Sequence, residues 1–267
     1  MSDMLLAVLK AVIIIGGMGI VFGALLGIAS KVFAVKTDER VPLITDVLPG
    51  ANCGGCGFAG CNAYAVALCE GTAKPNMCPV GGDTAASKIS EILGVSAEKT
   101  EKMVARVMCC GNNDNAVSKF EFDGVADCHS VAKIGGGDKM CSFGCLGFGS
   151  CVKACSFDGI SIQNGIAVID DSKCYGCGSC VAECPRDIIK LVPASLKYIV
   201  SCKSLEKGKI TRKDCSVGCI GCGICAKNCP KEAIEIIDNL AVIDYEKCVG
   251  CGICATKCPQ NTINKVC

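Results

Sequence analysis

The stretch Cys219-Ile-Gly-Cys-Gly-Ile-Cys-Ala-Lys-Asn-Cys229-Pro230 decides the fold of the second half of this chain. Its spacing is C-x2-C-x2-C-x3-C-P, which lets three thiolates on one tight loop bind three irons of a single cubane. The fourth cysteine stands at the head of the next helix and faces a different cluster, and the proline suits the first turn of that helix. The stretch therefore predicts a pair of [4Fe–4S] clusters in a small α+β module.

The same run occurs two more times, at residues 174–184 and 248–258. The sequence around these two runs is an internal repeat, because residues 166–170 precede the first run just as residues 240–244 precede the second, with a constant offset between matching positions. Each repeat reads as a short apolar strand, a cysteine-rich loop and a short helix. We therefore expect two bacterial ferredoxin-like modules, at residues 140–193 and 194–267.

A disulfide scaffold or a set of zinc sites could also account for the 27 cysteines. The count is odd and the spacings are short and repeated, which favours metal over disulfides. Zinc sites use C-x2-C pairs, but not three close cysteines followed by a crossed fourth. In a paired module the fourth cysteine of each run binds the cluster of the other run, which we call the crossing rule. This rule predicts two ligand sets, which are Cys219, Cys222 and Cys225 with Cys258, and Cys248, Cys251 and Cys254 with Cys229.

The partner of the 174–184 run lies upstream of it. Cys141, Cys145, Cys151 and Cys155 are spaced C-x3-C-x5-C-x3-C, a lengthened version of the motif in which Ser156 stands where proline is usual. By the same crossing rule we expect two further ligand sets, which are Cys141, Cys145 and Cys151 with Cys184, and Cys174, Cys177 and Cys180 with Cys155.

A different motif opens the soluble part of the chain, at residues 37–96. Cys53-Gly-Gly-Cys56-Gly-Phe-Ala-Gly-Cys61 is followed by Cys78-Pro79. Four thiolates separated by glycine-rich spacers suit one more [4Fe–4S] cluster in a domain of its own, because glycine lets the backbone wrap closely. The expected total is five clusters.

Seven cysteines remain outside these sets, namely Cys69, Cys109, Cys110, Cys128, Cys202, Cys215 and Cys267. One hypothesis is a sixth cluster site formed by Cys110, Cys128, Cys202 and Cys215, with Cys109 as the substitute for Cys110. The alternative is that these residues are free thiols. Three of them lie in residues 97–139, a mixed segment that ends in Gly135-Gly136-Gly137 and that we interpret as a linker.

Residues 1–36 are predicted to be a transmembrane anchor. Residues 11–30 carry no charge, and a helix of that length spans ~30 Å, the thickness of a bilayer core. The larger group of basic residues follows this run, which predicts that the rest of the chain lies on the cytoplasmic side of the cell membrane. A secretory signal peptide is the alternative, but the apolar run is long for one and no clear small-x-small cleavage site follows it.

The sequence offers no catalytic site. No glycine-rich dinucleotide fingerprint follows an expected strand, and no nucleophile–histidine–acid set accompanies the single histidine, His129. A net charge of +1 gives no reason to expect nucleic-acid binding. Residues 197–213 carry six basic residues against one acidic residue, which is either a docking patch for an acidic partner or a solvated loop.

With its anchor, its CGGCGFAGC loop at residues 53–61 and its paired ferredoxin-like modules, the chain resembles the B subunits of the Rnf complexes. These complexes are membrane-bound ferredoxin:NAD oxidoreductases coupled to sodium or proton transport. The resemblance implies that electrons arrive from soluble reduced ferredoxin and pass to other membrane and peripheral subunits. It leaves the coupling ion open. The alternative is an electron-transfer subunit of a different membrane-bound reductase or hydrogenase.

Overall fold

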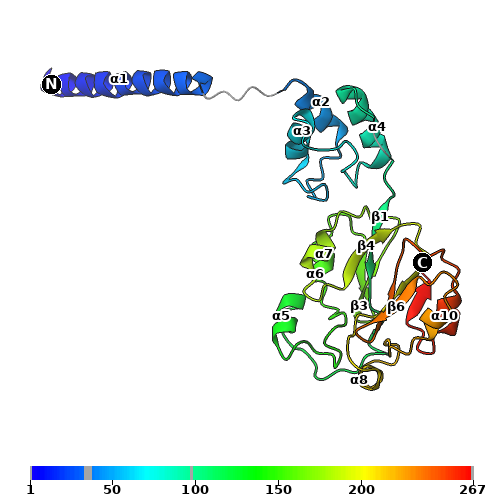
Figure 1. Ribbon diagram of the computed structural model, residues 1–267. Coiled ribbons are helices and arrows are strands. Elements are labelled where there is room, and N and C mark those ends of the chain that lie inside the picture. The colour runs from blue at the N-terminus through cyan, green and yellow to red at the C-terminus, as the bar shows by residue number, and fades with distance from the viewer. Residues whose placement is uncertain (1, 33–37, 97–98, 266–267) are drawn as a thin grey trace. The chain divides into compact units, whose positions relative to one another are not determined.

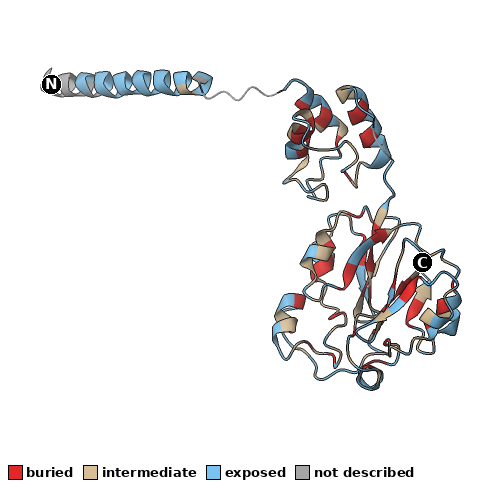
Figure 2. Cartoon of the chain, in the orientation of Figure 1, coloured by how far each residue is buried: buried red, intermediate tan, exposed pale blue. Residues whose placement is uncertain are grey.

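The computed structural model describes residues 2–32, 38–96 and 99–265, and divides into two units at Glu39 and Arg40. The first unit is helix α1 (Ser2–Val32), which is drawn in blue in Figure 1. Within it, Val12–Lys31 is long and apolar enough to cross a membrane. Its described side chains are almost all exposed, as the pale colour in Figure 2 shows. An apolar helix that buries nothing in its own chain fits the expected membrane anchor.

Three helices form the first part of the second unit. They are α2 (Arg40–Val47), α3 (Cys61–Cys69) and α4 (Gly82–Leu93). Their inner faces, red in Figure 2, share one core that includes Ile44, Tyr64 and Ile89. Helix α4 buries its positions 85, 86 and 89 and ends at Gly94, whose left-handed backbone (φ 66°) ends the helix. The loops between these helices carry Cys53, Cys56 and Cys78 of the first motif, and Cys61 begins helix α3.

Two β-hairpins form the centres of the two ferredoxin-like modules. In the first module β2 (Ile160–Gln163) pairs with β3 (Ile166–Ile169), and in the second β6 (Ile234–Ile237) pairs with β7 (Leu240–Ile243), all antiparallel. Both connecting turns hold two residues at positive φ, which matches the twist that a two-residue hairpin turn requires. The hairpins occupy equivalent positions in the two halves of the repeat, as the sequence predicts.

The short helices and the outer strands follow the same repeat. Helices α6 (Ser150–Lys153) and α7 (Ser179–Glu183) of the first module correspond to α9 (Ile224–Lys227) and α10 (Ile253–Lys257) of the second. Strand β4 (Ile189–Pro193) likewise corresponds to β8 (Ile263–Lys265). The fold is therefore the expected helix, cysteine-rich domain and two small α+β modules.

A leading strand completes each module. Strand β1 (Met103–Val107) pairs with β4, and β5 (Tyr198–Val200) pairs with β8. Strand β1 lies in the 97–139 segment that we interpreted as a linker, so part of that segment belongs to the first module. Val104, Val192 and Ile199, which come from strands of both modules, share one buried core with Met108. The two modules are therefore packed against each other.

Residues 108–139 of the 97–139 segment pack against both modules. The segment contains helix α5 (Cys128–Lys133), and the second module has a surface helix of its own, α8 (Gly208–Asp214), labelled in Figure 1. Backbone hydrogen bonds join Val117 to Asp214 and Ser216 to Asn115. Residues 108–118 thus run along the second module before the chain returns to the first.

Tyr64 fixes the loop that leads to Cys78. The side chain is 1% exposed, and its hydroxyl donates to the Lys74 carbonyl (2.6 Å) and accepts from the Met77 amide (3.2 Å). Burial raises the pKa of Tyr64 to about 12. Because this pKa is raised, the stability that the neutral phenol contributes is present below pH 10 and is lost as the pH rises toward 12.

We expect Tyr64→Phe to destabilise the cysteine-rich domain by about 1–3 kcal/mol, since two partly buried backbone groups lose their partner. The variant should also lose part of the alkaline sensitivity above pH 10. Cluster bleaching during anaerobic urea unfolding of the full chain measures both effects. Tyr175→Phe, at a residue that is 40% exposed, is the matched control and should unfold like the wild type. Equal midpoints for the two variants would contradict this role of Tyr64.

Candidate iron–sulfur sites

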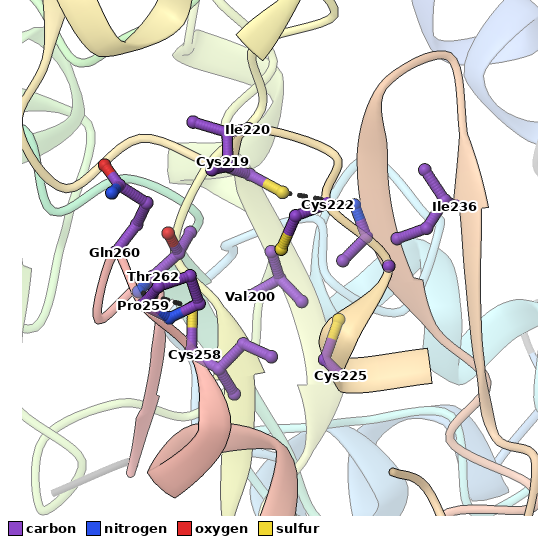
Figure 3. Close-up of a pocket in the computed structure, with 13 residues that line it drawn as sticks. Val200, Cys219, Ile220, Cys222, Cys225, Ile236, Cys258, Pro259, Gln260 and Thr262 are labelled. Carbon is purple, nitrogen blue, oxygen red and sulfur yellow. Dashed lines mark hydrogen bonds between the residues drawn. The ribbon is translucent and has the colours of Figure 1, made fainter. Parts of the chain in front are cut away.

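The structure brings Cys219, Cys222 and Cys225 together with Cys258, which lies in the other run of the same module. Figure 3 shows the four sulfur atoms facing a common space. The surrounding side chains are apolar, among them Val200 and Ile236. The crossed arrangement expected from the spacing is therefore present in the geometry of this pocket.

Two more pockets repeat this arrangement. Cys229 joins Cys248, Cys251 and Cys254 in one, and Cys155 joins Cys174, Cys177 and Cys180 in the other. The empty space at the pocket of Figure 3, at the pocket described next and at these two is about 350, 330, 360 and 350 Å³, open solvent included. Four hollows of nearly equal size, each lined by four cysteines, fit four copies of the same group.

The fourth pocket differs from expectation in one residue. It is lined by Cys145, Cys151 and Cys184, as expected, but the fourth cysteine is Cys128 where the spacing suggested Cys141. The reason lies in the repeat, because Phe148 holds the position in the first module that Cys222 holds in the second. Phe148 packs in one small core with Cys128 and Leu146, so Cys128 supplies the missing thiol from outside the run.

Hydrogen bonds hold Cys128 at this pocket. Asp127 caps helix α5 by accepting from the His129 and Ser130 amides, and it also accepts from the Ser150 hydroxyl (2.8 Å). Ser150 in turn accepts from the Cys128 amide (2.8 Å). The Ser150 bond and the two amides lower the pKa of Asp127, so the cap remains charged at neutral pH. Helix α5 is thereby attached to the start of α6.

Backbone N–H groups point at the cysteine sulfurs. Cys145 accepts from Ala167 (3.4 Å), and the corresponding Cys219 accepts from Ala241 (3.5 Å). Cys155 accepts from Gly159, and the corresponding Cys229 from Ala233. Donors of this kind stabilise a sulfur that carries negative charge and tune cluster potentials. The donor set and the hollows therefore fit [4Fe–4S] clusters.

Burial of the cysteine side chains also changes the pKa values of their thiols. Burial raises the pKa of Cys151 and Cys180 to about 12, and that of Cys225 to about 11. Water at neutral pH therefore does not deprotonate these thiols, and a bound cation is required to hold them as thiolates.

The cysteine-rich domain also has a backbone N–H group that donates to a cysteine sulfur and a cysteine whose pKa is raised by burial. The Asn52 side chain accepts from the Cys61 amide (2.8 Å), and Cys78 accepts from the Gly81 amide (3.3 Å). Burial, and then negative charge at Cys56 and Cys53, raise the pKa of Cys78. Cys56, Cys61 and Cys78 all pack against the core of this domain. Cys53 and Cys56 lie close enough to Cys78 to raise its pKa, and Cys61 packs against the same core as Cys56 and Cys78.

The remaining cysteines separate into two groups. The Cys110 thiol donates to the Ser201 carbonyl (3.3 Å), and burial is the main cause that raises its pKa to about 12. Cys69 is half-buried at the edge of the first core. Cys267 lies outside the described residues. Cys109, Cys202 and Cys215 lie near Cys110, where the two modules meet.

Family comparisons agree with the positions of these sites. Residues 48–80 match an Fe-S cluster family, which covers the first motif. Residues 140–188 and 218–262 match a 4Fe-4S dicluster domain, and residues 173–234 match a second 4Fe-4S dicluster family. The cofactor expected from the cysteine spacing, the [4Fe–4S] cluster, is thereby confirmed as a class.

Curated relatives cover nearly the whole chain. The B subunit of the Na(+)-translocating ferredoxin:NAD(+) oxidoreductase complex of Acetobacterium woodii is 46% identical over 91% of this chain and 74% of its own length. The B subunit of the proton-translocating complex of Clostridium ljungdahlii is 44% identical, over 89% and 84%. The B subunit of the ion-translocating oxidoreductase complex of Methanosarcina acetivorans is 41% identical, over 90% and 91%.

The chain belongs to the family of Rnf complex B subunits. The resemblance stated from the CGGCGFAGC loop and the paired modules is confirmed. One relative is named for sodium translocation and another for proton translocation, and the two match this chain at similar identity. Sequence similarity alone therefore does not identify the coupling ion.

The crossed pairing can be tested by counting iron in double variants. We expect Cys222→Ala with Cys258→Ala to lose about four iron per chain, since both residues line one pocket. Cys254→Ala with Cys258→Ala should lose about eight, although these residues are neighbours in sequence. Iron and acid-labile sulfide in anaerobically purified full chain are the measurement. The reverse order of the two losses would contradict the crossing.

Proposed function

We propose that this member of the Rnf B family takes electrons from reduced soluble ferredoxin and relays them to other subunits of an ion-translocating ferredoxin:NAD oxidoreductase complex. The observation that carries the proposal is the series of equal four-cysteine pockets in two packed modules. When bound, each [4Fe–4S] cluster accepts one electron and gives it up again. The names of the relatives supply the ferredoxin and NAD chemistry. The chain itself converts no substrate.

Five ligand sets belong to this proposal. They are Cys53, Cys56, Cys61 and Cys78; Cys128, Cys145, Cys151 and Cys184; Cys155, Cys174, Cys177 and Cys180; Cys219, Cys222, Cys225 and Cys258; and Cys229, Cys248, Cys251 and Cys254. The second set replaces Cys141 of the spacing-based expectation with Cys128. The other four sets are those that the sequence predicted.

The protein's part in electron transfer is to hold and insulate these sites. The apolar linings limit water at the pockets, and the backbone N–H groups stabilise negative charge on sulfur. Because the donors Ala167 and Ala241 belong to hairpins β2–β3 and β6–β7, which are fixed by their ladders, the sulfurs that they contact need little rearrangement when charge changes. A rigid surrounding of this kind suits a relay.

The proposal places the soluble domains on the cytoplasmic side of the cell membrane. Lys10 precedes the apolar span, whereas Lys31, Lys36 and Arg40 follow it. This asymmetry supports a cytoplasmic C-terminal side. Gly19, Gly23 and Gly27 recur every four residues in α1, a spacing that lets another membrane helix approach closely. We propose that a membrane subunit of the complex packs there.

A basic surface supports entry of electrons at the second module. Lys209, Arg212 and Lys213, on or beside α8, line an open hollow together with Ile220. Ile220 also lines the pocket of Figure 3, where Cys222 is exposed. A basic surface next to a cluster site favours an acidic electron donor, because opposite charges steer the encounter. We propose that reduced ferredoxin docks on this surface.

We expect the double variant Lys209→Glu and Arg212→Glu to slow ferredoxin oxidation by about tenfold at low ionic strength and to weaken its dependence on salt. Stopped-flow mixing of reduced ferredoxin with the assembled complex measures the rate. Lys88→Glu with Lys133→Glu makes the same change of charge at exposed lysines elsewhere. Equal slowing in both variants would show a general effect of charge and would contradict docking at α8.

A further inference from the structure

Four cysteines outside the five sets lie where the two modules meet, and they form two matched pairs. Cys109 follows β1 and Cys202 follows β5, in each case two residues after the strand ends. Cys141 and Cys215 hold equivalent positions in the repeat and begin the matching stretches Cys-Ser-Phe-Gly-Cys145 and Cys-Ser-Val-Gly-Cys219. Each module thus contributes the same two thiols from the same two places in its fold.

The hydrogen bonds of the first pair are also matched. The Cys109 sulfur accepts from the Gly111 amide and from the Cys145 amide, both at 3.4 Å. The Cys202 sulfur accepts from the Ser204 amide (3.4 Å) and from the Cys219 amide. Cys145 and Cys219 are themselves corresponding residues. This pattern of N–H donors is the one found at the pocket sulfurs.

The second pair follows a similar rule. The Cys141 sulfur accepts from the Phe143 amide, and the Cys215 sulfur accepts from the Val217 amide, in each case two residues further along the chain. Cys110 differs, because its thiol donates to the Ser201 carbonyl and its sulfur accepts from the Asn264 side chain rather than from a backbone amide. The bonding pattern therefore separates the four thiols from their neighbour Cys110.

Glycines keep the space between these sulfurs open. A Cβ atom on Gly111 would stand 3.3 Å from the Cys215 sulfur and 3.6 Å from the Cys109 sulfur. A Cβ atom on Gly144 would stand 3.6 Å from the Cys141 sulfur and 3.7 Å from the Cys109 sulfur. Three of the four sulfurs therefore surround a space that side chains at these two positions would enter.

A buried positive charge lies beside the same space. Lys139 is 4% exposed, and its ammonium donates to the carbonyls of Gly111 (3.1 Å) and Gly165 (2.8 Å), which are neutral groups. A buried ammonium is costly unless negative charge lies nearby. An anionic group held by Cys109 and Cys215 would supply that charge.

We propose that Cys109, Cys141, Cys202 and Cys215 hold a sixth [4Fe–4S] cluster that links the two modules. Four thiols release four protons as their sulfurs bind four irons of an incoming cluster, and no electron is exchanged. The proposal extends the relay function and depends on it.

Its place in the relay follows from the shared amides. Cys109 bonds to the amide of Cys145, which lines the Cys128 pocket, and Cys202 bonds to the amide of Cys219, which lines the pocket of Figure 3. A cluster here would therefore stand between a site of the first module and a site of the second. Electrons that enter at the second module would cross to the first through this position.

Iron and sulfide counts on the anaerobically purified full chain test the proposal. We expect about 24 iron per wild-type chain and about 20 for Cys109→Ala or Cys202→Ala. The matched control is Cys110→Ser, which keeps a donor for the Ser201 carbonyl and should retain about 24. A wild-type count of about 20 that Cys109→Ala leaves unchanged overturns the sixth site while the five other sets stand. One zinc per chain that Cys109→Ala removes also overturns it.

Double variants assign Cys141 and Cys128. Cys109→Ala with Cys141→Ala should lose only one cluster and retain about 20 iron, whereas Cys109→Ala with Cys128→Ala should lose two and retain about 16. The opposite result would return Cys141 to the first module's pocket and overturn the assignment. If a variant does not fold, native mass spectrometry of the unmodified chain still counts the clusters, and five rather than six refutes the proposal.

Discussion

Bonds from backbone N–H groups to buried cysteine sulfurs are the interaction on which this structure depends. The chain has no tryptophan and few aromatic residues, and cysteines form part of both module cores. Burial raises the pKa values of the cysteine thiols in these cores. Each buried sulfur must therefore either keep its proton or bind a metal. The hairpins and cysteine loops are arranged to meet that need.

The need for backbone N–H donors at the sulfurs also explains why each cysteine loop lies close to the turn of its module's hairpin. Gly147 and Gly221 are corresponding residues at positive φ, and a Cβ atom on them would stand 2.4 and 2.8 Å from the carbonyl oxygens of Gly165 and Asn239. The cysteine loop can therefore lie directly on the hairpin turn only if these residues are glycine. This contact brings the amides of Ala167 and Ala241 to the first cysteine of each loop.

Much of this organisation could be predicted from sequence, because cubane ligation imposes a fixed spacing on cysteines. The two modules and the crossed set that ends at Cys258 follow from that spacing alone. The place of Cys128 does not, because it reaches its pocket from a helix outside any motif. One signal was present in the sequence. Extending the repeat upstream at its constant offset aligns Cys141 with Cys215 and Phe148 with Cys222, which marks a missing ligand in the first module.

Strand β1 was not predicted from the sequence, for a related reason. The strand is short and mixed in composition. Its partner β4 follows only after the hairpin and cysteine loops of the first module, so no local sequence pattern indicates the pairing. The grouping of Cys109 with Cys202 depends on this pairing, because it requires that β1 and β5 play the same part in the two modules. Long-range contacts of this kind become visible only when the chain is folded.

The exposed cysteines mark the end of the proposed relay that a partner protein can approach. Among the cysteines that the structure describes, only Cys222 and Cys251 are exposed, and both belong to the second module. The sulfurs between the modules are half-buried or buried. Electron transfer to a partner needs a cluster near the surface, while transfer within the chain gains from sites shielded from water. The basic residues beside Cys222 lie where exchange with an outside protein is easiest, and the matched thiols between the modules lie where an electron would have to pass to leave that end.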